Sequence, residues 1–221
     1  MAKEYLRRFA VCLIGLVLCG LGCAFGVQAG AAGTNAWGTL NIGLAGICGF
    51  SVGTASLIIG ALVIGIDIIG KGKIGFGTLL NAVVVSLFTD VFVALFRLLP
   101  SSGSIAVGVV YSLLGQVILS FAMVLYMIPA LGCGPRDTLM VIVGKKFPKA
   151  PIGAAKFGID VFALIIGVLL GAPFGIGTVL VMALQAGIFQ FACRVCRFEP
   201  RSVNHEDVAD TVRRIRNGKG A

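Results

Sequence analysis

The chain has 221 residues, of which 58% are hydrophobic and only 12% are charged, with a mean hydropathy of +1.03 and a formal net charge of +9. Soluble domains carry about 25% charged residues, so the composition excludes a soluble protein and indicates an integral membrane protein of one domain. The positive charge does not indicate nucleic-acid binding, because the cytoplasmic loops of membrane proteins are themselves basic.

Six apolar segments are each long enough to cross a bilayer, which requires about 20 residues. In chain order they cover residues 9–28, 52–69, 75–98, 105–127, 152–170 and 175–193. The first follows a basic start, as a signal peptide would, but lacks a convincing cleavage site of small residues. Gly22, Gly26 and Gly30 continue it as a packing stripe for the fourth segment or for a second subunit. We therefore interpret it as a retained span.

Two further apolar segments, residues 35–48 and 135–144, are too short to cross. Each follows the first span of its half of the chain. They are predicted to be short helices that either re-enter the membrane or lie along its interfaces, and the sequence leaves both alternatives open.

The chain repeats itself at an offset of about 100 residues. "GFGTLL" at residues 75–80 returns as "GIGTVL" at 175–180, and "SVGTAS" at 51–56 returns as "PIGAAK" at 151–156. "NAWGTLN" at 35–41 matches "GPRDTLM" at 134–140, one residue out of step. The pattern predicts an all-α membrane domain over residues 1–198, built from two repeats, about 8–98 and 108–198, of three spans and one short helix each.

An odd number of spans per repeat requires the second repeat to enter the membrane inverted. With the N-terminus inside, Lys3, Lys71, Lys145 and the basic C-terminus all fall on the cytoplasmic side, as the positive-inside rule requires. We therefore expect a multi-pass protein of the bacterial inner membrane with both termini cytoplasmic. Residues 199–221 are predicted to form a basic amphipathic tail helix, capped by Asn204 and ended by Gly218, on the anionic cytoplasmic leaflet.

The second short segment places adjacent charges behind a helix-start signal. Gly134 can cap the helix and Pro135 suits its first position, which puts Arg136 and Asp137 in the first turn. If both short helices re-enter the membrane, their N-terminal amides form a positive focus for an anion, to which Arg136 adds a bidentate fork. The predicted solute-binding residues are Asn35, Trp37, Gly134, Arg136, Asp137 and Thr138. The alternative is a solvated Arg136–Asp137 pair at the cytoplasmic edge.

Three motifs carry a resemblance to a known family: "LGCGPRDTLM", "GFSVGTASLIIG" and "GFGTLLNAVVVSLFTD". They resemble the YczE/YitT family of small bacterial membrane proteins, whose members carry a GxGPxDxL-like motif after the first span of each half. The first-half motif departs from this pattern, with Ala36 for the proline and Gly38 for the acid. The resemblance implies a transporter-like membrane protein whose charged chemistry is concentrated in the second motif.

Polar residues inside spans are further candidates, since such residues are costly in lipid. Asp90, with Gln190 as its repeat mate and Asn81 on the same span, is predicted to bind a coupling proton or cation, or else to bond a neighbouring helix. Lys156 and Asp160 are spaced for a salt bridge. Asp67 is interpreted as interfacial.

No residue pattern indicates an enzyme, a metal site or a cofactor. The CxxC pair at Cys193–Cys196 has no second pair, and the single histidine, His205, lies in the tail. The sequence thus predicts a transporter for a small anionic or zwitterionic solute, with membrane lipid and a possible second subunit as its partners. The alternative is a non-transporting component that binds a ligand or protein and assists another machine.

Overall fold

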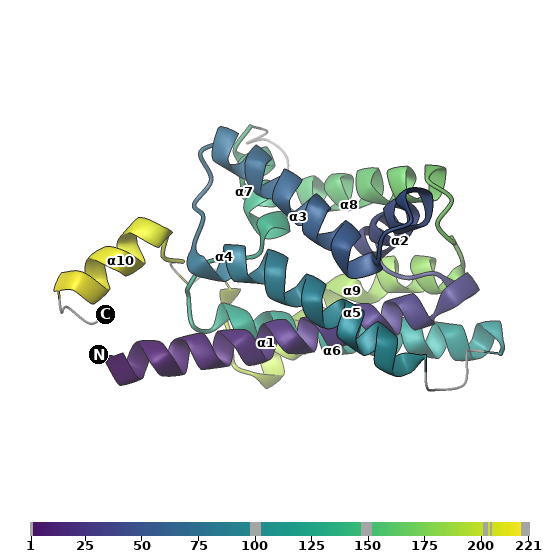
Figure 1. The fold of residues 1–221 in the computed structure, drawn as a ribbon, viewed down its shortest axis with the longest axis horizontal. Coiled ribbons are helices and arrows are strands. Elements are labelled where there is room, and N and C mark those ends of the chain that lie inside the picture. The colour runs from purple at the N-terminus through teal and green to yellow at the C-terminus, as the bar shows by residue number, and fades with distance from the viewer. Residues whose placement is uncertain (1, 98–102, 147–151, 201–202, 204, 218–221) are drawn as a thin grey trace.

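The protein folds into a bundle of helices, as a computed structural model shows (Figure 1). The structure describes residues 2–97, 103–146, 152–200, 203 and 205–217, and no strand occurs among them. The long helices are α1 (Ala2–Gln28), α3 (Val52–Ile69), α6 (Ile105–Met127), α8 (Ile152–Leu169) and α9 (Ile176–Val195). A further long helix is made of three pieces, α4 (Phe76–Leu80), η2 (Asn81–Val85) and α5 (Ser86–Phe96). The short elements are η1 (Gly30–Ala32), α2 (Ala36–Cys48), α7 (Pro135–Lys146) and α10 (Val208–Asn217).

Five helices in the described part of the chain are long and apolar enough to cross a membrane, namely α1, α3, the composite helix 76–96, α6 and α9. The predicted fifth span corresponds to α8, which has 18 residues and follows a stretch outside the described residues. That α8 crosses the membrane as a sixth span stays a prediction.

The third predicted span is not a regular α-helix. Residues Asn81–Val85 form a π-helical turn between α4 and α5. Such single turns interrupt α-helices frequently at functional sites, because the extra residue changes the direction of the side chains around it. Here the turn presents Asn81 to the interior cavity described below.

The centre of the bundle is the close packing of α1 on α6. Gly22 lies against Leu119 and the carbonyl of Gly115, and Gly15 lies against the backbone of Tyr126. A Cβ atom at Gly15 would lie 2.6 Å from the Tyr126 nitrogen, so only glycine permits this approach. Of the predicted glycine stripe, Gly22 therefore packs on the fourth span within the chain, whereas Gly26 lies against the Thr34 side chain before α2.

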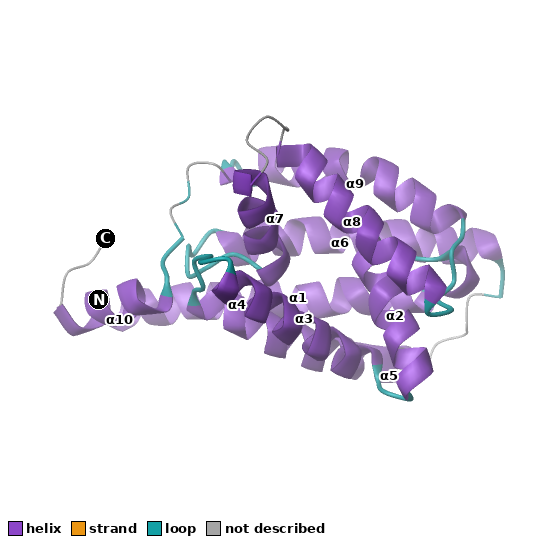
Figure 2. Cartoon of the chain, turned by 90° about the horizontal axis from the view of Figure 1, so that it is seen from above, coloured by secondary structure: helices purple, strands orange, loops and turns teal. Residues whose placement is uncertain are grey.

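The two short helices begin close to this core. Asn35 caps α2, with its side chain accepting a hydrogen bond from Gly38 N at 2.8 Å, and α7 begins at Pro135 as predicted. The two views place α2 and α7 towards opposite ends of the long axis of the bundle (Figure 2).

The loop before each short helix packs against the "GxGT" motif of the other half of the chain. Gly75 and Gly77 lie against the backbone of residues 131–132, which precede α7. Gly175 and Gly177 lie against the backbone of residues 31–33, which precede α2. Each half of the chain thus holds the short helix of the other half in place.

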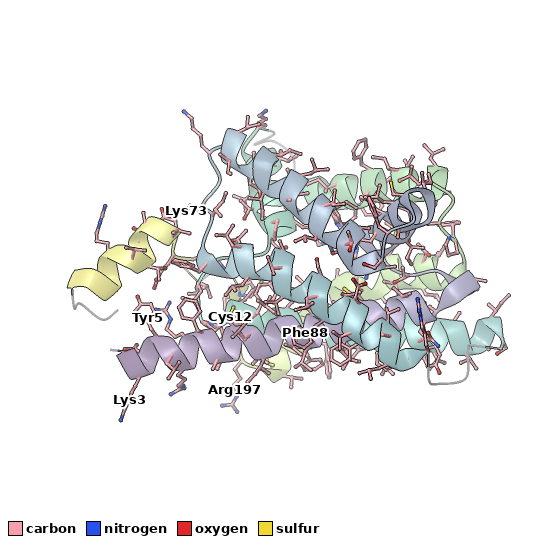
Figure 3. All side chains as sticks on the ribbon, in the orientation of Figure 1. Lys3, Tyr5, Cys12, Lys73, Phe88 and Arg197 are labelled. Carbon is pink, nitrogen blue, oxygen red and sulfur yellow. The ribbon has the colours of Figure 1, made fainter. Side chains whose placement is uncertain are left out.

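The tail docks on the N-terminal part of α1 through Glu206, which precedes α10. Its carboxylate accepts hydrogen bonds from Arg8 at 2.7 Å, Thr211 at 2.9 Å and Tyr5 at 3.4 Å. Figure 3 labels Tyr5 on the end of α1 that lies beside α10. Glu206 therefore anchors the tail, and Asp207 caps α10 by accepting a hydrogen bond from Asp210 N. The predicted cap Asn204 and terminator Gly218 lie outside the described residues.

Candidate functional site

A cavity of about 150 Å³ lies at the centre of the bundle, where the N-terminal turns of both short helices meet. Residues of α1, α3, η2, α6, α8 and α9 complete its wall. Most of the residues predicted from sequence to form a site line it: Asn35, Trp37, Asn81, Gly134, Arg136, Asp137, Lys156 and Asp160. These residues come from segments far apart in the chain.

Arg136 and Trp37 face each other across this cavity. The guanidinium carbon of Arg136 lies 4.5 Å from the centroid of the indole ring, within the range of a cation–π contact. Both side chains belong to the first turn of their helices, α7 and α2, which explains why the two starts must lie close together. Neither of the ion pairs found among the described residues involves Arg136, so its charge is available to a ligand.

Asp160 on α8 is held by three donors. It accepts from Lys156 Nζ at 2.7 Å, from Trp37 Nε1 at 3.0 Å and from Gln185 Nε2 at 3.2 Å. The predicted salt bridge between Lys156 and Asp160 is confirmed, with side chains 46% and 5% exposed. Trp37 therefore connects the two charged groups, because its ring contacts Arg136 and its N–H binds Asp160.

Asp137 forms a hydrogen bond with Tyr126 of α6. Its carboxylate accepts a hydrogen bond from the Tyr126 hydroxyl at 3.2 Å. The described residues show it neither capping the first turn of α7 nor paired with Arg136. Tyr126 and Gln185 line the cavity and were not predicted. The signal that could have found them is a polar group in an apolar span, and Gln116, another such residue, also lines the cavity.

Three of the predicted residues do not line the cavity. Thr138 is buried beside it and donates to Gly134 O at 3.4 Å. Gln190 is exposed on α9. Asp90 accepts from Ser51 Oγ at 2.5 Å and from Gly53 N at 2.7 Å, so it bonds the start of α3. These contacts match the structural alternative for Asp90, because a carboxylate beside free amides at a helix N-terminus is stabilised there.

Asp67, interpreted from sequence as interfacial, is buried inside the bundle, and its depth in the membrane stays a prediction. This residue is 0% exposed, and neither of its carboxylate oxygens has a hydrogen-bond partner among the described residues. It does not line the cavity. The helix end on which it lies is covered by α7, which apolar periodicity alone does not predict.

The site offers charge and hydrogen bonding, with no arrangement for a metal ion. Within the described ranges no three histidine, cysteine, aspartate or glutamate side chains gather closely enough to hold one. The wall instead combines two cations, Arg136 and Lys156, with two carboxylates, Asp137 and Asp160. Such a surface can bind an ion or a dipolar molecule by complementary charge.

Comparison with known proteins places the chain among bacterial membrane proteins. A family model described as "Family of unknown function (DUF6198)" matches residues 6–194. The chain is similar to the uncharacterized membrane protein YczE of Bacillus subtilis (strain 168), with 28% identity over 87% of this chain and 88% of the relative. It is also similar to an uncharacterized protein of Haemophilus influenzae, with 29% identity over 84% of this chain and 83% of the relative. No solved structure matches.

These matches confirm the resemblance that the three motifs indicated. They cover both short helices, both "GxGT" motifs and every helix that lines the cavity. The chain therefore belongs to the DUF6198 family and is a YczE-like, multi-pass membrane protein.

Proposed function

We propose that this protein is a transporter for a small zwitterionic or anionic solute that binds in the cavity. The observation that carries the proposal is Arg136, a cation that stacks on Trp37 and lines the cavity without an ion-pair partner in the described chain. A desolvated guanidinium with open donors is suited to a carboxylate or phosphate, which it binds through two parallel hydrogen bonds.

The remaining charges favour a zwitterion within this class. Lys156 and Arg136 are balanced in the cavity wall by Asp160 and Asp137, so the wall has no large net charge. An anionic group on Arg136 and a cationic group near a carboxylate would satisfy both signs. A cavity of about 150 Å³ accepts a molecule of about the size of benzene, which limits the solute to a few heavy atoms.

The composition of the wall supports the two-repeat architecture. Residues at an offset of 100 line the same cavity: Cys19 and Leu119, Cys23 and Met123, Ser56 and Lys156, Gly60 and Asp160, and Val85 and Gln185. The short helices contribute Trp37 and Arg136 at the offset of 99 that their motifs share. In four of these pairs the second half of the chain supplies the charged or more polar member, namely Lys156, Asp160, Gln185 and Arg136. The site is thus asymmetric although its frame is repeated.

Inverted repeats whose half-helices meet at a midplane site are typical of secondary transporters. The two short helices fit this scheme as re-entrant elements, because their N-termini share the cavity and their bodies lie towards opposite ends of the bundle (Figure 2). In this proposal α8 is the sixth span, both chain termini are cytoplasmic, and alternating access arises from movement of α2 and α7 about the site.

A binding screen followed by a flux measurement tests the proposal. Full-length protein in detergent would be titrated with amino acids, betaines, small mono- and dicarboxylates, phosphate and, as a negative set, alkylammonium cations. We expect stabilisation against heat by a zwitterion or anion, loss of that stabilisation in Arg136→Gln, and its retention in Arg194→Gln, which changes an exposed arginine outside the cavity.

The solute found would then be tested in proteoliposomes by counterflow. Counterflow that Arg136→Gln abolishes is the expected result. Binding without any flux would support the alternative, a membrane component that senses a ligand for another machine. Stabilisation by cations alone, unaffected by Arg136→Gln, would contradict both the solute class and the role of Arg136.

A further inference from the structure

Asp67 is a buried carboxylate that the solute site does not use. It lies in the last turn of α3, is 0% exposed, and has no hydrogen-bond partner for either carboxylate oxygen in the described part of the chain. An ionised carboxylate without donors is costly in an apolar environment. Its place near the C-terminus of a helix adds to this cost, because the helix dipole there repels negative charge.

The residues that follow Asp67 pack against α7. Gly72 N donates to the backbone carbonyl of Asp67 at 2.8 Å, and Gly72 in turn lies against Thr138 and Ile142 of α7. Gly70 also lies against Ile142, with only 2.9 Å between a Cβ built on this glycine and the Ile142 Cγ2 atom. The end of α3 that carries Asp67 is therefore closed over by α7.

Neither ion pair found among the described residues includes Asp67. In α7 the charged residues are Arg136 and Asp137 at its start, which face the cavity, and Lys145 and Lys146 at its end. On the composite helix 76–96 the charged residue is Asp90, which bonds the opposite end of α3, and α2 has none. Lys71 and Lys73 follow in exposed positions, and the titratable neighbour before α7 is the Cys133 thiol.

The corresponding contact in the other half of the chain is made by a glycine. Gly167 on α8, at an offset of 100 from Asp67, lies against α2 so closely that a Cβ atom would be 2.6 Å from the Leu40 nitrogen. The contact between α8 and α2 is thus made with a glycine, without a carboxylate at the position that corresponds to Asp67. Asp67 is an addition for which packing gives no reason.

We propose that Asp67 is a proton-binding site, protonated while α3 and α7 are packed together, and that loss of the proton separates these helices. A protonated carboxyl group is neutral and tolerates burial, whereas the carboxylate requires water, which can reach it only if the contact opens. Since α7 carries Arg136 and Asp137 into the cavity, the proton is coupled to the position of the solute-binding groups. The statement that this proton drives solute movement rests on the proposed function, whereas the proton site itself does not.

A proton fits this place better than a metal cation. Hard cations take several oxygen ligands at once, six or more for Ca²⁺ and close to six for Mg²⁺. Asp67 has no second carboxylate paired with it in the described residues, and the neighbouring side chains Thr138 and Ile142 lie in a packed contact.

The first test is the pH dependence of stability, measured on full-length protein in detergent between pH 5 and 9 at constant ionic strength. The native state would bind one proton more than the unfolded chain, so stability must fall as pH rises through the range in which the native protein releases it. We expect the midpoint of thermal unfolding of the wild-type protein to fall by about 3–5 °C for each pH unit in that range. Asp67→Asn should remove this slope, and Asp90→Asn should retain it.

The second test is hydrogen exchange of the α7 amides, expressed relative to the intrinsic exchange rate at each pH. If separation of α3 and α7 releases one proton, its equilibrium constant rises about tenfold for each unit of increase in pH. The α7 amides should therefore lose protection as pH rises in the wild-type protein and keep it in Asp67→Asn. If Asp67→Asn does not fold, Asp67→Gly, which copies Gly167, takes its place.

The proposal is overturned if wild-type stability and α7 protection have the same pH dependence as in the Asp67 variants. Restoration of wild-type stability at pH 9 by sodium ions, with choline as the control ion, would overturn it as well, because the site would then bind a cation. Neither measurement uses a solute, so a negative result here is distinct from failure of the proposed transport.

Discussion

Arg136 lies over the ring of Trp37, with its guanidinium carbon 4.5 Å from the ring centroid, although the two residues stand in different halves of the chain. Each occupies the first turn of a short helix that packs against the opposite half. The contact therefore depends on both halves being folded and correctly placed. Arg136 lines the cavity, and neither ion pair found in the described part of the chain includes it.

The first prediction is that Arg136→Lys weakens solute binding although it keeps the charge. Lysine cannot present two parallel donors or stack flat on the indole. Loss of one charged hydrogen bond in a desolvated site costs about 2–3 kcal/mol, which is a factor of roughly 30 to 150 in affinity. Trp37 is the single tryptophan of the chain, so its fluorescence during a titration with the solute measures this change directly.

Arg194→Lys is the matched control, because Arg194 is exposed on α9 outside the cavity wall. Its titration curve should coincide with that of the wild-type protein. An Arg136→Lys protein with wild-type affinity would exclude recognition through the planar fork.

The second prediction concerns Trp37→Phe, which keeps an aromatic ring but removes the indole N–H. This donor holds Asp160 at 3.0 Å, and phenylalanine is also a weaker partner for a guanidinium. We expect affinity for the solute to fall by about 1 kcal/mol, or a factor of about 5, as measured by calorimetry. A loss as large as that of Arg136→Gln would indicate that the solute itself stacks on the indole.

The third prediction separates Asp90 from the solute site. Asp90→Asn should lower the stability by about 1–2 kcal/mol, because the charge-assisted bonds to Ser51 and Gly53 at the start of α3 are weakened. Solute affinity and counterflow should stay at wild-type values. Loss of counterflow with normal thermal stability would return Asp90 to the role of a coupling residue.

Helix ends were predictable where local chemistry sets them. The bounds of α3 and α6 agree with the predicted 52–69 and 105–127, since Ser51 and Ser104 cap these helices with their side chains. The start of α1 was not predictable in this way. The apolar pattern indicates only the part of a helix that lipid covers, whereas α1 continues through charged residues to Ala2. The π-helical turn at Asn81–Val85 has no signal in hydrophobic periodicity.

The site residues were predictable where charge stands in an unexpected place, as at Arg136 and Asp160. Their partners were not, because Tyr126 and Gln185 reach them from other helices, and sequence spacing reports neighbours on one helix only. The role of Asp90 depends in the same way on the position of α3. Burial of Asp67 depends on α7, whose packing is a property of the assembled fold.

The fourth prediction tests the topology with two native thiols. Cys48 ends α2 and Cys196 follows α9, and both are exposed. In single-cysteine proteins, a membrane-impermeant maleimide added to intact cells should label Cys48, whereas Cys196 should react only after permeabilisation. A Gly103→Cys protein, changed at an open position before α6, should behave as Cys48 does. Reaction of both native thiols from the same side would contradict the inverted arrangement of the two halves.

The last prediction is that acidification releases the tail. Burial lowers the pKa of His205, and its Nδ1 atom has no hydrogen-bond partner among the described residues, so the docked tail favours the neutral imidazole. A depressed histidine pKa contributes stability that is present above the unfolded value of about 6.5 and is lost as pH falls towards the lower folded value. Hydrogen exchange of residues 205–212, corrected for intrinsic rates, should therefore increase between pH 7 and 5. His205→Gln should remove this dependence, because glutamine does not titrate.

Glu206→Gln should instead release the tail at every pH, since it removes the ion pair with Arg8 at 2.7 Å. Equal protection of the tail at pH 7 and 5 in the wild-type protein would show that His205 is not the group that controls docking.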